Sequence, residues 1–468
     1  MTVHADSLQL DMQAKPADLP VGWPFELPNK QRRRLGLYAA MAGADIAALI
    51  LGFALASWLL FGQPIGWQSA RLTGLVLPLF AVLAVSQRAY GVDALTEPPR
   101  GAARAIFALS LALGIVLMIL HQLGLLRLFN GWIVAYAVAF TVPLVMLGRG
   151  AMRRVTAWAL PDHPVSELVI ADEVAVRGTS RQLVVNARGL GIAPDVSNPH
   201  MLDRVGKLLK NVDRVTVACA PDRQDSWALI LKGAGVSGEV RTAQGSTPFG
   251  AEPVDIFADR YAVFAPPGAL GLSLKRGMDL AIVVPTLVFV APLLLVLAIA
   301  IKIDSPGPVF FVQDRIGRGN RLFRMYKLRT MRSEATDADG AVSASREDGR
   351  VTRIGRTLRA TSMDELPQLL NILLGSMSLV GPRPHALGST ASEKLFWDID
   401  RRYWLRHACA PGLTGLAQVR GFRGATHHSS DLENRLAADL EYMRTWSPWL
   451  DVKIMLMTFG VVVHRNAF

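Results

Sequence analysis

Four apolar stretches near the N-terminus constrain the fold of this chain more than any other feature. They run near residues 37–61, 71–87, 105–123 and 131–148. Each is close to the roughly 20 residues that an α-helix needs to cross a bilayer. The 468-residue chain is 51% hydrophobic and carries a formal net charge of +12. We therefore predict a basic, multi-pass membrane protein that begins with a four-helix transmembrane bundle.

The positions of the cations predict how these helices are oriented. Basic residues precede the first stretch, separate the second from the third and follow the fourth: Lys30 to Arg34, then Arg88, Arg100 and Arg104, then Arg149, Arg153 and Arg154. The other side has only Arg71 and Arg127, so the positive-inside rule places the N-terminus and everything after residue 150 in the cytoplasm. A polar leader at residues 1–34 comes first, so we expect no cleavable signal peptide.

A less apolar region, residues 151–268, follows the four stretches. Short β-type runs at 168–171, 215–218 and 239–241, separated by helix-like segments, predict a small α/β domain with a parallel sheet. The first run is followed by Asp172 and Glu173 instead of the glycine-rich turn of a dinucleotide-binding unit. The pattern fits either a ligand-binding domain or a packing and dimerisation module.

The most informative polar motif is Asp364-Glu365. Ser362 and Glu365 have the spacing of a capping box, which predicts both acids in the first turn of a helix, where Pro367 is tolerated. The dipole and free N–H groups of such a turn favour negative charge. Asp364 is therefore a candidate nucleophile toward phosphorus, and Glu365 could share a divalent cation with substrate phosphates. The same spacing also fits two acids that only cap a helix.

Cations surround this acidic pair in the sequence. Arg383 lies between Pro382 and Pro384, which fix the backbone and so the direction of the guanidinium, and we predict that it binds phosphate or substrate. The upstream cations suit a multiply charged phosphate donor, although single members also fit a solvated or lipid-facing surface. They are Arg321, Arg324, Lys327, Arg329, Arg332, Arg350, Arg353, Arg356 and Arg359.

Several short motifs follow one another in order between Lys275 and about Thr458. They are Lys275-Arg276 with Asp279, Ser305-Pro306-Gly307-Pro308-Val309, Gln313-Asp314-Arg315-Ile316-Gly317, Lys327-Leu328-Arg329-Thr330-Met331, Asp364-Glu365-Leu366-Pro367-Gln368, Gly381-Pro382-Arg383-Pro384, Pro411-Gly412-Leu413-Thr414-Gly415 and Gln418-Val419-Arg420-Gly421-Phe422-Arg423-Gly424. With these motifs the chain resembles the bacterial sugar transferase family, the polyprenyl-phosphate hexose-1-phosphate transferases, also called monotopic phosphoglycosyl transferases. Leu328 and Arg420 depart from the residues usual in that family, which leaves fine substrate preference open.

The resemblance implies a reaction and a set of site residues. Asp364 would be the covalent nucleophile, Glu365 its acid/base or metal-site partner, and Mg²⁺ at this pair the cofactor. Asp364 would attack the sugar-linked phosphate of a nucleotide sugar and expel the nucleoside monophosphate, and a polyprenyl phosphate would then attack the phosphosugar-enzyme. By position, the expected phosphate contacts are Arg359, Arg383 and Arg423, with Lys327 and Arg329 as second choices.

Large members of the family place four spans and a Rossmann-like domain before the catalytic part, so we expect domains at 1–34, 35–150, 151–268 and 269–468. We predict transfer of hexose 1-phosphate from a UDP-sugar, with UDP-glucose favoured, to undecaprenyl phosphate at the cytoplasmic face of the bacterial inner membrane. This would be the first membrane step of exopolysaccharide or related glycan synthesis. A UDP-galactose or N-acetylhexosamine donor and a non-catalytic scaffold of a polysaccharide assembly complex stay open. The family suggests a homodimer in contact with membrane lipids, and no nucleic-acid module is present.

The apolar run Asp279–Ile301 poses a topological problem. As a straight span it would put the middle domain and Asp364 on opposite sides of the membrane, yet nucleotide sugars are cytoplasmic and cations flank both of its ends. Pro292 near its middle, with Pro285 before it, can break the helix into two arms that each reach about one leaflet. We predict a re-entrant helical hairpin at residues 275–302 of an α/β monotopic catalytic domain, as the family also implies.

Several other polar residues are left outside the predicted site. The two cysteines lie far apart without metal-ligand spacing, which argues against a disulfide framework or a zinc site. His385 and the pair at 427–428 lack a third ligand at zinc spacing, and oxygen ligands suit Mg²⁺ better. Arg435 and Asp439, one helical turn apart, are interpreted as a pair on a helix surface.

Overall fold

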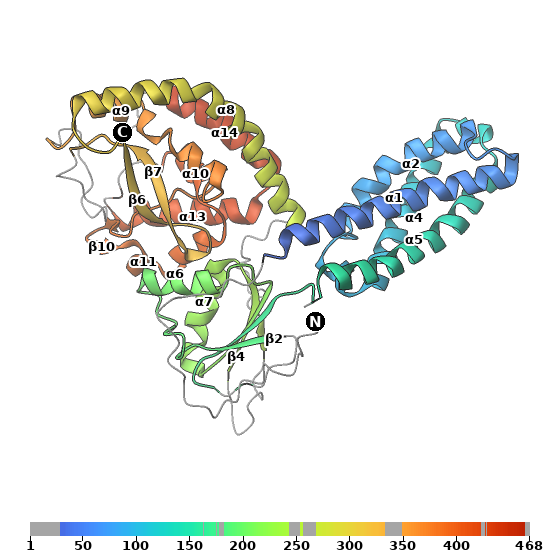
Figure 1. Ribbon diagram of the computed structural model, residues 1–468, viewed down its shortest axis with the longest axis horizontal. Coiled ribbons are helices and arrows are strands. Elements are labelled where there is room, and N and C mark those ends of the chain that lie inside the picture. Colours follow the sequence, from blue (N-terminus) through green and yellow to red (C-terminus); the bar gives the residue numbers. More distant parts are fainter. Residues whose placement is uncertain are drawn as a thin grey trace. The chain divides into compact units, whose positions relative to one another are not determined.

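The computed structural model describes residues 29–161, 163–174, 176, 182–242, 253–255, 268–332, 349–422, 426 and 428–463. The chain divides into two compact units, one of residues 28–166 and one that contains residues 167–468. Long helices are visible in both units in Figure 1.

The first unit contains the four long apolar helices that the sequence predicts. Each is long and apolar enough to cross a membrane. The fourth continues to Ala159, well beyond the predicted boundary at residue 150. The elements are α1 Gln31–Phe61, α2 Trp67–Ser86, α3 Val92–Thr96, α4 Pro98–Gln122, η2 Leu125–Leu128 and α5 Gly131–Ala159.

A buried ion pair joins α1 to α5. Nη2 of Arg149 lies 2.6 Å from Oδ2 of Asp45, and the two side chains are 3% and 1% exposed. Nη1 of Arg149 donates to the Ala89 carbonyl at 3.1 Å, which ties the segment after α2 to the same pair. Opposite charge and hydrogen bonds replace water for both groups, as a buried pair requires.

The second unit begins with the predicted α/β region and its mainly parallel sheet. The strand order is β2-β1-β3-β4-β5, with every neighbouring pair parallel except β4 and β5. The strands β1, β3 and β4 confirm the three runs predicted from the sequence. The bounds are β1 Glu167–Ala171, β2 Gln182–Asn186, α6 Pro199–Leu208, β3 Arg214–Cys219, η3 Pro221–Arg223, α7 Gln224–Ala234, β4 Ser237–Thr242 and β5 Pro253–Asp255.

The rest of this unit consists of one long helix followed by short strands and helices. Strands β6 and β7 form an antiparallel hairpin, β8 and β11 are parallel, and β9 and β10 are antiparallel. The elements are α8 Gly268–Asp304, β6 Phe310–Ile316, η4 Arg318–Asn320, β7 Leu322–Leu328, α9 Arg353–Ala360, η6 Met363–Glu365, α10 Gln368–Leu374, β8 Ser378–Val380, β9 Thr390–Ala391, β10 Lys394–Leu395, α11 Phe396–Ile399, η7 Arg401–Ala408, β11 Gly412–Thr414, α12 Leu416–Val419, α13 Ser429–Thr445 and α14 Pro448–Val463.

The sheet region and the C-terminal part share one hydrophobic core. Trp227 of α7 belongs to the same buried cluster as Phe396 and Trp404 of the C-terminal part. Gly206 of α6 approaches the Gly319 carbonyl so closely that a Cβ atom would clash with it. The predicted boundary at residue 268 therefore does not separate two independent cores, because both sides bury their apolar side chains against each other.

The helix α8 is held at both ends by the C-terminal part. Near its start, Nζ of Lys275 lies 2.6 Å from Oδ2 of Asp451 and donates to the Val380 carbonyl at 3.0 Å. Just past its end, the Ser305 carbonyl accepts a hydrogen bond of 2.6 Å from Arg329. These contacts attach both ends of the helix to the same compact unit.

Between these attachments α8 is apolar and exposed. Only 6% of the most apolar 18-residue segment of α8 is buried inside the protein. The chain stays helical through Pro285 and Pro292, so the break predicted at Pro292 is not an interruption of the helix. The helix curves instead, as Figure 1 shows, and bending is a common response of a helix to an internal proline.

Candidate active site

Asp364 and Glu365 lie in η6, a single 3-10 turn between α9 and α10. Ser362 ahead of this turn has a φ of 55° and makes no capping hydrogen bond with its side chain, and α10 begins only at Gln368. The predicted capping box is therefore wrong. An N-cap residue needs an extended backbone, whereas Ser362 has a left-handed one. The acids are presented by a tight turn and not by the first turn of a longer helix.

Two cations hold the Glu365 carboxylate. Nη2 of Arg383 lies 2.5 Å from Oε1, and Nζ of Lys327 on β7 lies 3.0 Å from the same oxygen. Burial alone would raise the pKa of Glu365, but Arg383 and Lys327 outweigh burial and hold that pKa well below its usual range. Glu365 is therefore ionised at neutral pH, and its charge fixes the positions of both cations.

The Asp364 carboxylate is in a different situation. It is partly buried, and no other side chain of the described residues forms an ion pair or a hydrogen bond with it. Burial raises its pKa above the usual value, and the neighbouring charge of Glu365 adds to this effect, while Lys327 and Arg359 oppose it. A desolvated carboxylate without a direct partner is a stronger nucleophile than one that is already paired.

Three of the five predicted phosphate contacts are thus brought to the acidic pair. Arg383 and Lys327 contact Glu365. Arg359, at the end of α9, acts on the charge of Asp364 and donates through Nε to Oγ1 of Thr330 at 2.9 Å. Arg423 lies outside the described residues.

Arg329 has another task than the phosphate contact predicted for it. Arg329 is buried, and its guanidinium donates to the carbonyls of Ser305 at 2.6 Å and Pro306 at 2.9 Å. These bonds fasten the chain that leaves α8 to the end of β7. Lys327 and Arg329 would lie on the same face only if one strand included both residues, and β7 ends at Leu328.

A buried layer supports Arg383 from behind. Nη2 of Arg406 donates to the Arg383 carbonyl at 2.8 Å and lies 2.7 Å from Oδ2 of Asp439. The side chains of Arg406 and Asp439 are 1% and 3% exposed. Nη1 of Arg406 also lies 2.7 Å from Nδ1 of His385, whose pKa is lowered by burial and by the nearby arginines. This layer holds the backbone that carries the Arg383 guanidinium.

Arg435 and Asp439 were interpreted as a pair on a helix surface, and this was wrong. Both are buried, and they lie on α13 on the same face as Leu432, Leu436 and Tyr442. That apolar spacing was the signal in the sequence, because two charges within an apolar stripe must face the interior. The hydrogen bond by which Arg406 supports Arg383 had no comparable signal in the sequence.

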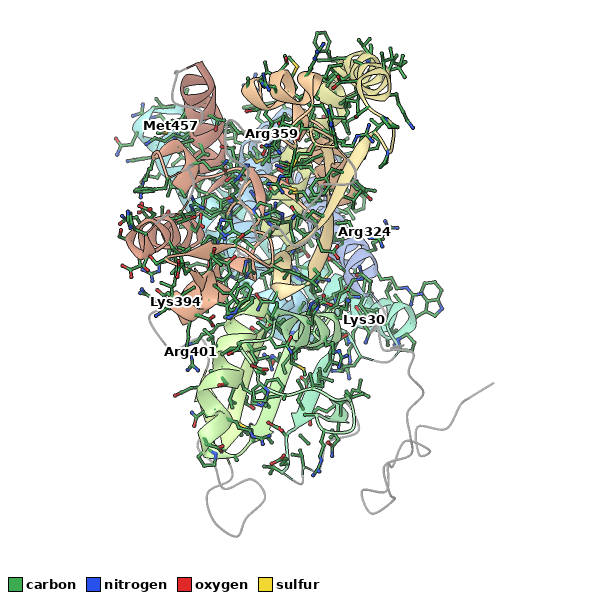
Figure 2. The ribbon with its side chains drawn as sticks, turned by 90° about the vertical axis from the view of Figure 1, so that its left-hand side faces the viewer. Lys30, Arg324, Arg359, Lys394, Arg401 and Met457 are labelled. Carbon is green, nitrogen blue, oxygen red and sulfur yellow. The ribbon has the colours of Figure 1, made fainter. Side chains whose placement is uncertain are left out.

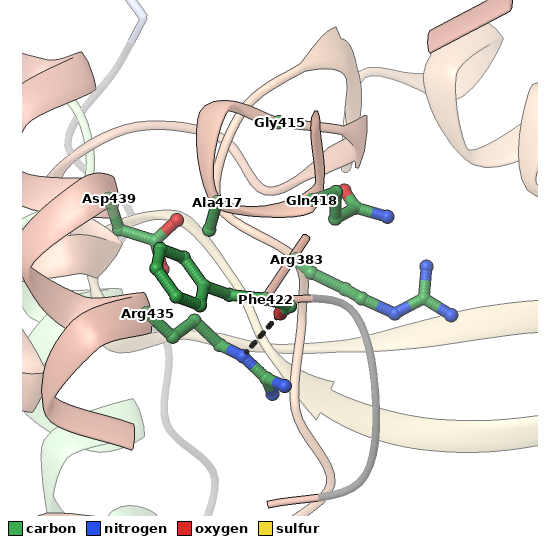
Figure 3. A pocket seen from close by; sticks show the side chains of 7 residues that line it. All are labelled: Arg383, Gly415, Ala417, Gln418, Phe422, Arg435 and Asp439. Carbon is green, nitrogen blue, oxygen red and sulfur yellow. Dashed lines mark hydrogen bonds between the residues drawn. The ribbon is translucent and has the colours of Figure 1, made fainter. Parts of the chain in front are cut away.

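A small pocket adjoins Arg383. Figure 3 shows its lining, with the Arg383 guanidinium pointing away from Asp439 and Arg435, and with Arg435 donating to the Phe422 carbonyl at 3.0 Å. The lining residues are Arg383, Gly415, Ala417, Gln418, Phe422, Arg435 and Asp439. Arg383 therefore joins this pocket to the acidic pair.

The acidic pair fits a Mg²⁺ ion only in company with substrate. Among the described residues, no group of three or more His, Cys, Asp or Glu side chains could hold a metal. Mg²⁺ commonly uses one or two carboxylates and takes its other ligands from water and substrate phosphates. Glu365 already faces two cations, so Asp364 is the carboxylate better placed to act as a ligand.

Long apolar helices together with a carboxylate pair among cations indicate a membrane-associated protein whose site suits phosphate groups. The family described as bacterial sugar transferase matches residues 270–465. An exopolysaccharide production protein of Rhizobium leguminosarum bv. phaseoli is 46% identical over 196 residues, which are 42% of this chain and 96% of that protein. The chain therefore belongs to the bacterial sugar transferase family.

Two further relatives are named for a specific reaction. An undecaprenyl-phosphate glucose phosphotransferase of Komagataeibacter xylinus is 50% identical over 195 residues, 42% of this chain but only 37% of that protein. A UDP-glucose:undecaprenyl-phosphate glucose-1-phosphate transferase of Caulobacter vibrioides is 51% identical over 195 residues, 42% of this chain and 72% of that protein. The likeness in all three cases covers a region of the size of the C-terminal part.

Proposed function

We propose that this protein transfers glucose 1-phosphate from UDP-glucose to undecaprenyl phosphate, giving undecaprenyl diphosphate glucose and UMP. The names of two relatives describe glucose phosphate transfer involving this carrier. The observation that carries the proposal is the contrast between the two acids: Glu365 is held by Lys327 and Arg383, whereas Asp364 has a raised pKa and no ion pair with any of the described residues. The product would begin an exopolysaccharide or a related glycan.

The reaction consists of two displacements at one phosphorus. An oxygen of Asp364 attacks the phosphorus that bears the sugar, and the bond from that phosphorus to the bridging oxygen breaks, so UMP leaves with the electron pair. A phosphate oxygen of undecaprenyl phosphate then attacks the same phosphorus and releases Asp364 as a carboxylate. Lys327 and Arg359 would offset the phosphate charge while the anionic carboxylate approaches it.

Mg²⁺ is part of this proposal. When bound, the ion would neutralise phosphate charge and polarise the phosphoryl oxygens. Asp364 would be its protein ligand together with substrate phosphates, and Glu365 would act mainly by holding Lys327 and Arg383 in place.

The donor is tested by UMP release from purified protein with Mg²⁺ and undecaprenyl phosphate. We expect release with UDP-glucose and much less with UDP-galactose, UDP-N-acetylglucosamine or UDP-N-acetylgalactosamine at equal concentration. Stronger release with another donor would replace the sugar but keep the chemistry. A folded preparation that releases no UMP with any donor would contradict the enzymatic proposal and favour a scaffold.

We also propose that α8 enters and leaves the bacterial inner membrane on its cytoplasmic side. The support is that Lys275 at one end and Ser305 at the other are both attached to the same compact unit, while the apolar middle of the helix is exposed. A straight helix of this length would instead separate its two ends by the thickness of a membrane.

Cysteine labelling tests this topology. Leu274→Cys and Lys302→Cys place a thiol at each end of α8, and Gln63→Cys places one between α1 and α2; all three positions are exposed. The natural Cys219 and Cys409 are buried. In intact spheroplasts, a membrane-impermeant maleimide should label only Gln63→Cys, and lysis should make both ends of α8 reactive. Labelling of just one end before lysis would show that α8 spans the membrane.

A further inference from the structure

Arg315 of β6 lies beside Arg383 and has no role in the mechanism so far. A β-bridge pairs Arg315 with Ala386, so this end of β6 runs along the segment that follows Arg383. The Arg315 guanidinium donates to Oε1 of Gln313 at 2.5 Å and more weakly to the Pro384 carbonyl at 3.5 Å. It is therefore oriented by neutral groups.

Arg315 forms no ion pair with a carboxylate of the described residues, and its buried Nε has no hydrogen-bond partner among them. Arg383 and Arg406, by contrast, each face a carboxylate. Burial and the like charge of Arg383 lower the pKa of Arg315 to about 10, so the group is still cationic at neutral pH. An anion between the two arginines would relieve this repulsion.

Arg315 differs from the cations nearest to Asp364. Lys327 and Arg359 oppose the rise in the pKa of Asp364, and Lys327 also pairs with Glu365. Arg383 pairs with Glu365 and is affected by the charge of Asp364 as well. Arg315 is affected by the charges of Arg383 and Glu365, and Asp364 is not among the charges that act on it. We therefore group Lys327 with Arg359 as one set, and Arg315 with Arg383 as a second set.

We propose that Arg315 and Arg383 together bind the nucleotide phosphate of the donor, which is the phosphate that departs as part of the leaving group. The inference rests on the proposed function, and it assigns different phosphates of the donor to the two sets of cations. When Asp364 attacks, the bridging oxygen keeps the electron pair of the broken bond, and the nucleoside monophosphate gains negative charge. Two guanidinium groups can meet that charge with several N–H donors at once, and no proton has to move.

Binding of UMP to the full-length protein tests this site without turnover. We expect Arg315→Gln to weaken UMP binding about 10-fold or more, the effect of losing a hydrogen bond to a charged group. Binding of uridine, which has no phosphate, should not change. Arg315→Lys should fall between, because lysine keeps the charge but not the planar fork. The control is Arg401→Gln, which removes an exposed arginine at the start of η7 in the same unit (Figure 2).

The outcomes separate this inference from the proposed function. UMP affinity that is the same in Arg315→Gln and Arg401→Gln, or no UMP binding by the unmodified protein, would overturn the inference. Equal losses for UMP and uridine would show a structural role and overturn it as well. If Arg315→Gln unfolds, a selective loss of UMP affinity in folded Arg315→Lys supports the site and unchanged affinity refutes it. Failure of every UDP-sugar to react, with UMP binding still dependent on Arg315, would remove the enzymatic proposal and leave the phosphate site.

Discussion

Asp364→Asn should reduce UMP release by at least about 10⁴-fold, because an amide cannot form the covalent phosphosugar intermediate. Asparagine has nearly the same shape, and Asp364 forms no ion pair with the described residues that the change would break, so the thermal unfolding midpoint should stay close to that of the unmodified protein. Without undecaprenyl phosphate, the unmodified protein should release about one UMP per active site, and the variant none. Intact-protein mass should show the matching phosphosugar adduct only in the unmodified protein.

Asp314→Asn is the matched control for this experiment. Asp314 is an exposed acid on β6, so the control makes the same chemical change in the same unit. It should retain its rate of UMP release. Substantial turnover by Asp364→Asn, with the adduct present, would rule out Asp364 as the nucleophile and direct attention to Glu365.

Asp439→Asn should destabilise the protein by about 3–5 kcal/mol, because it leaves Arg406 buried without its counter-charge. A loss of this size lowers the unfolding midpoint by on the order of 10 °C. Arg406 also holds the Arg383 backbone, so the variant should lose transfer activity at temperatures where it is still folded. Thermal unfolding and UMP release in the same detergent would measure both effects.

The neighbouring pair of Arg420 and Glu441 provides the comparison. Glu441 is also on α13, but its side chain is 48% exposed and that of Arg420 is 41% exposed. Exposed pairs contribute only about 0–1 kcal/mol, so Glu441→Gln should change the midpoint little. Equal shifts for the two variants would contradict the argument that the Asp439 pair is important because it is buried.

The sequence predicted the long helices and the central strands correctly, because both depend on the local apolar pattern. The four apolar stretches became α1, α2, α4 and α5, and three β-type runs became β1, β3 and β4. The predictions that failed depended on the backbone or on distant partners. Ser362 has the right side chain for a cap but a left-handed backbone, which the spacing could not reveal.

The candidate site was predicted in part for the same physical reason. The motif around Asp364 and Glu365 identified the acids, but which cation meets which acid depends on a β-hairpin and a proline turn that come together only in the folded chain. Arg329 looked equivalent to Lys327 in the sequence, yet it is used to fasten α8. Arg406 supports Arg383 across a long separation in sequence, which no local pattern encodes.

Separating the C-terminal part from the rest of this chain would expose apolar side chains that are buried in the intact protein. The match to the Rhizobium relative covers 196 residues, which are 96% of that protein. That relative is therefore too short to contain an equivalent of the sheet region. Here, Trp404 is 1% exposed because it belongs to the core that includes Trp227 of α7. A fragment of residues 270–465 would present Trp404 and Phe396 to water and would tend to aggregate. Deletion of the rest of the chain would therefore not be enough to obtain a soluble C-terminal part. The apolar side chains that become exposed would also have to be replaced by polar ones.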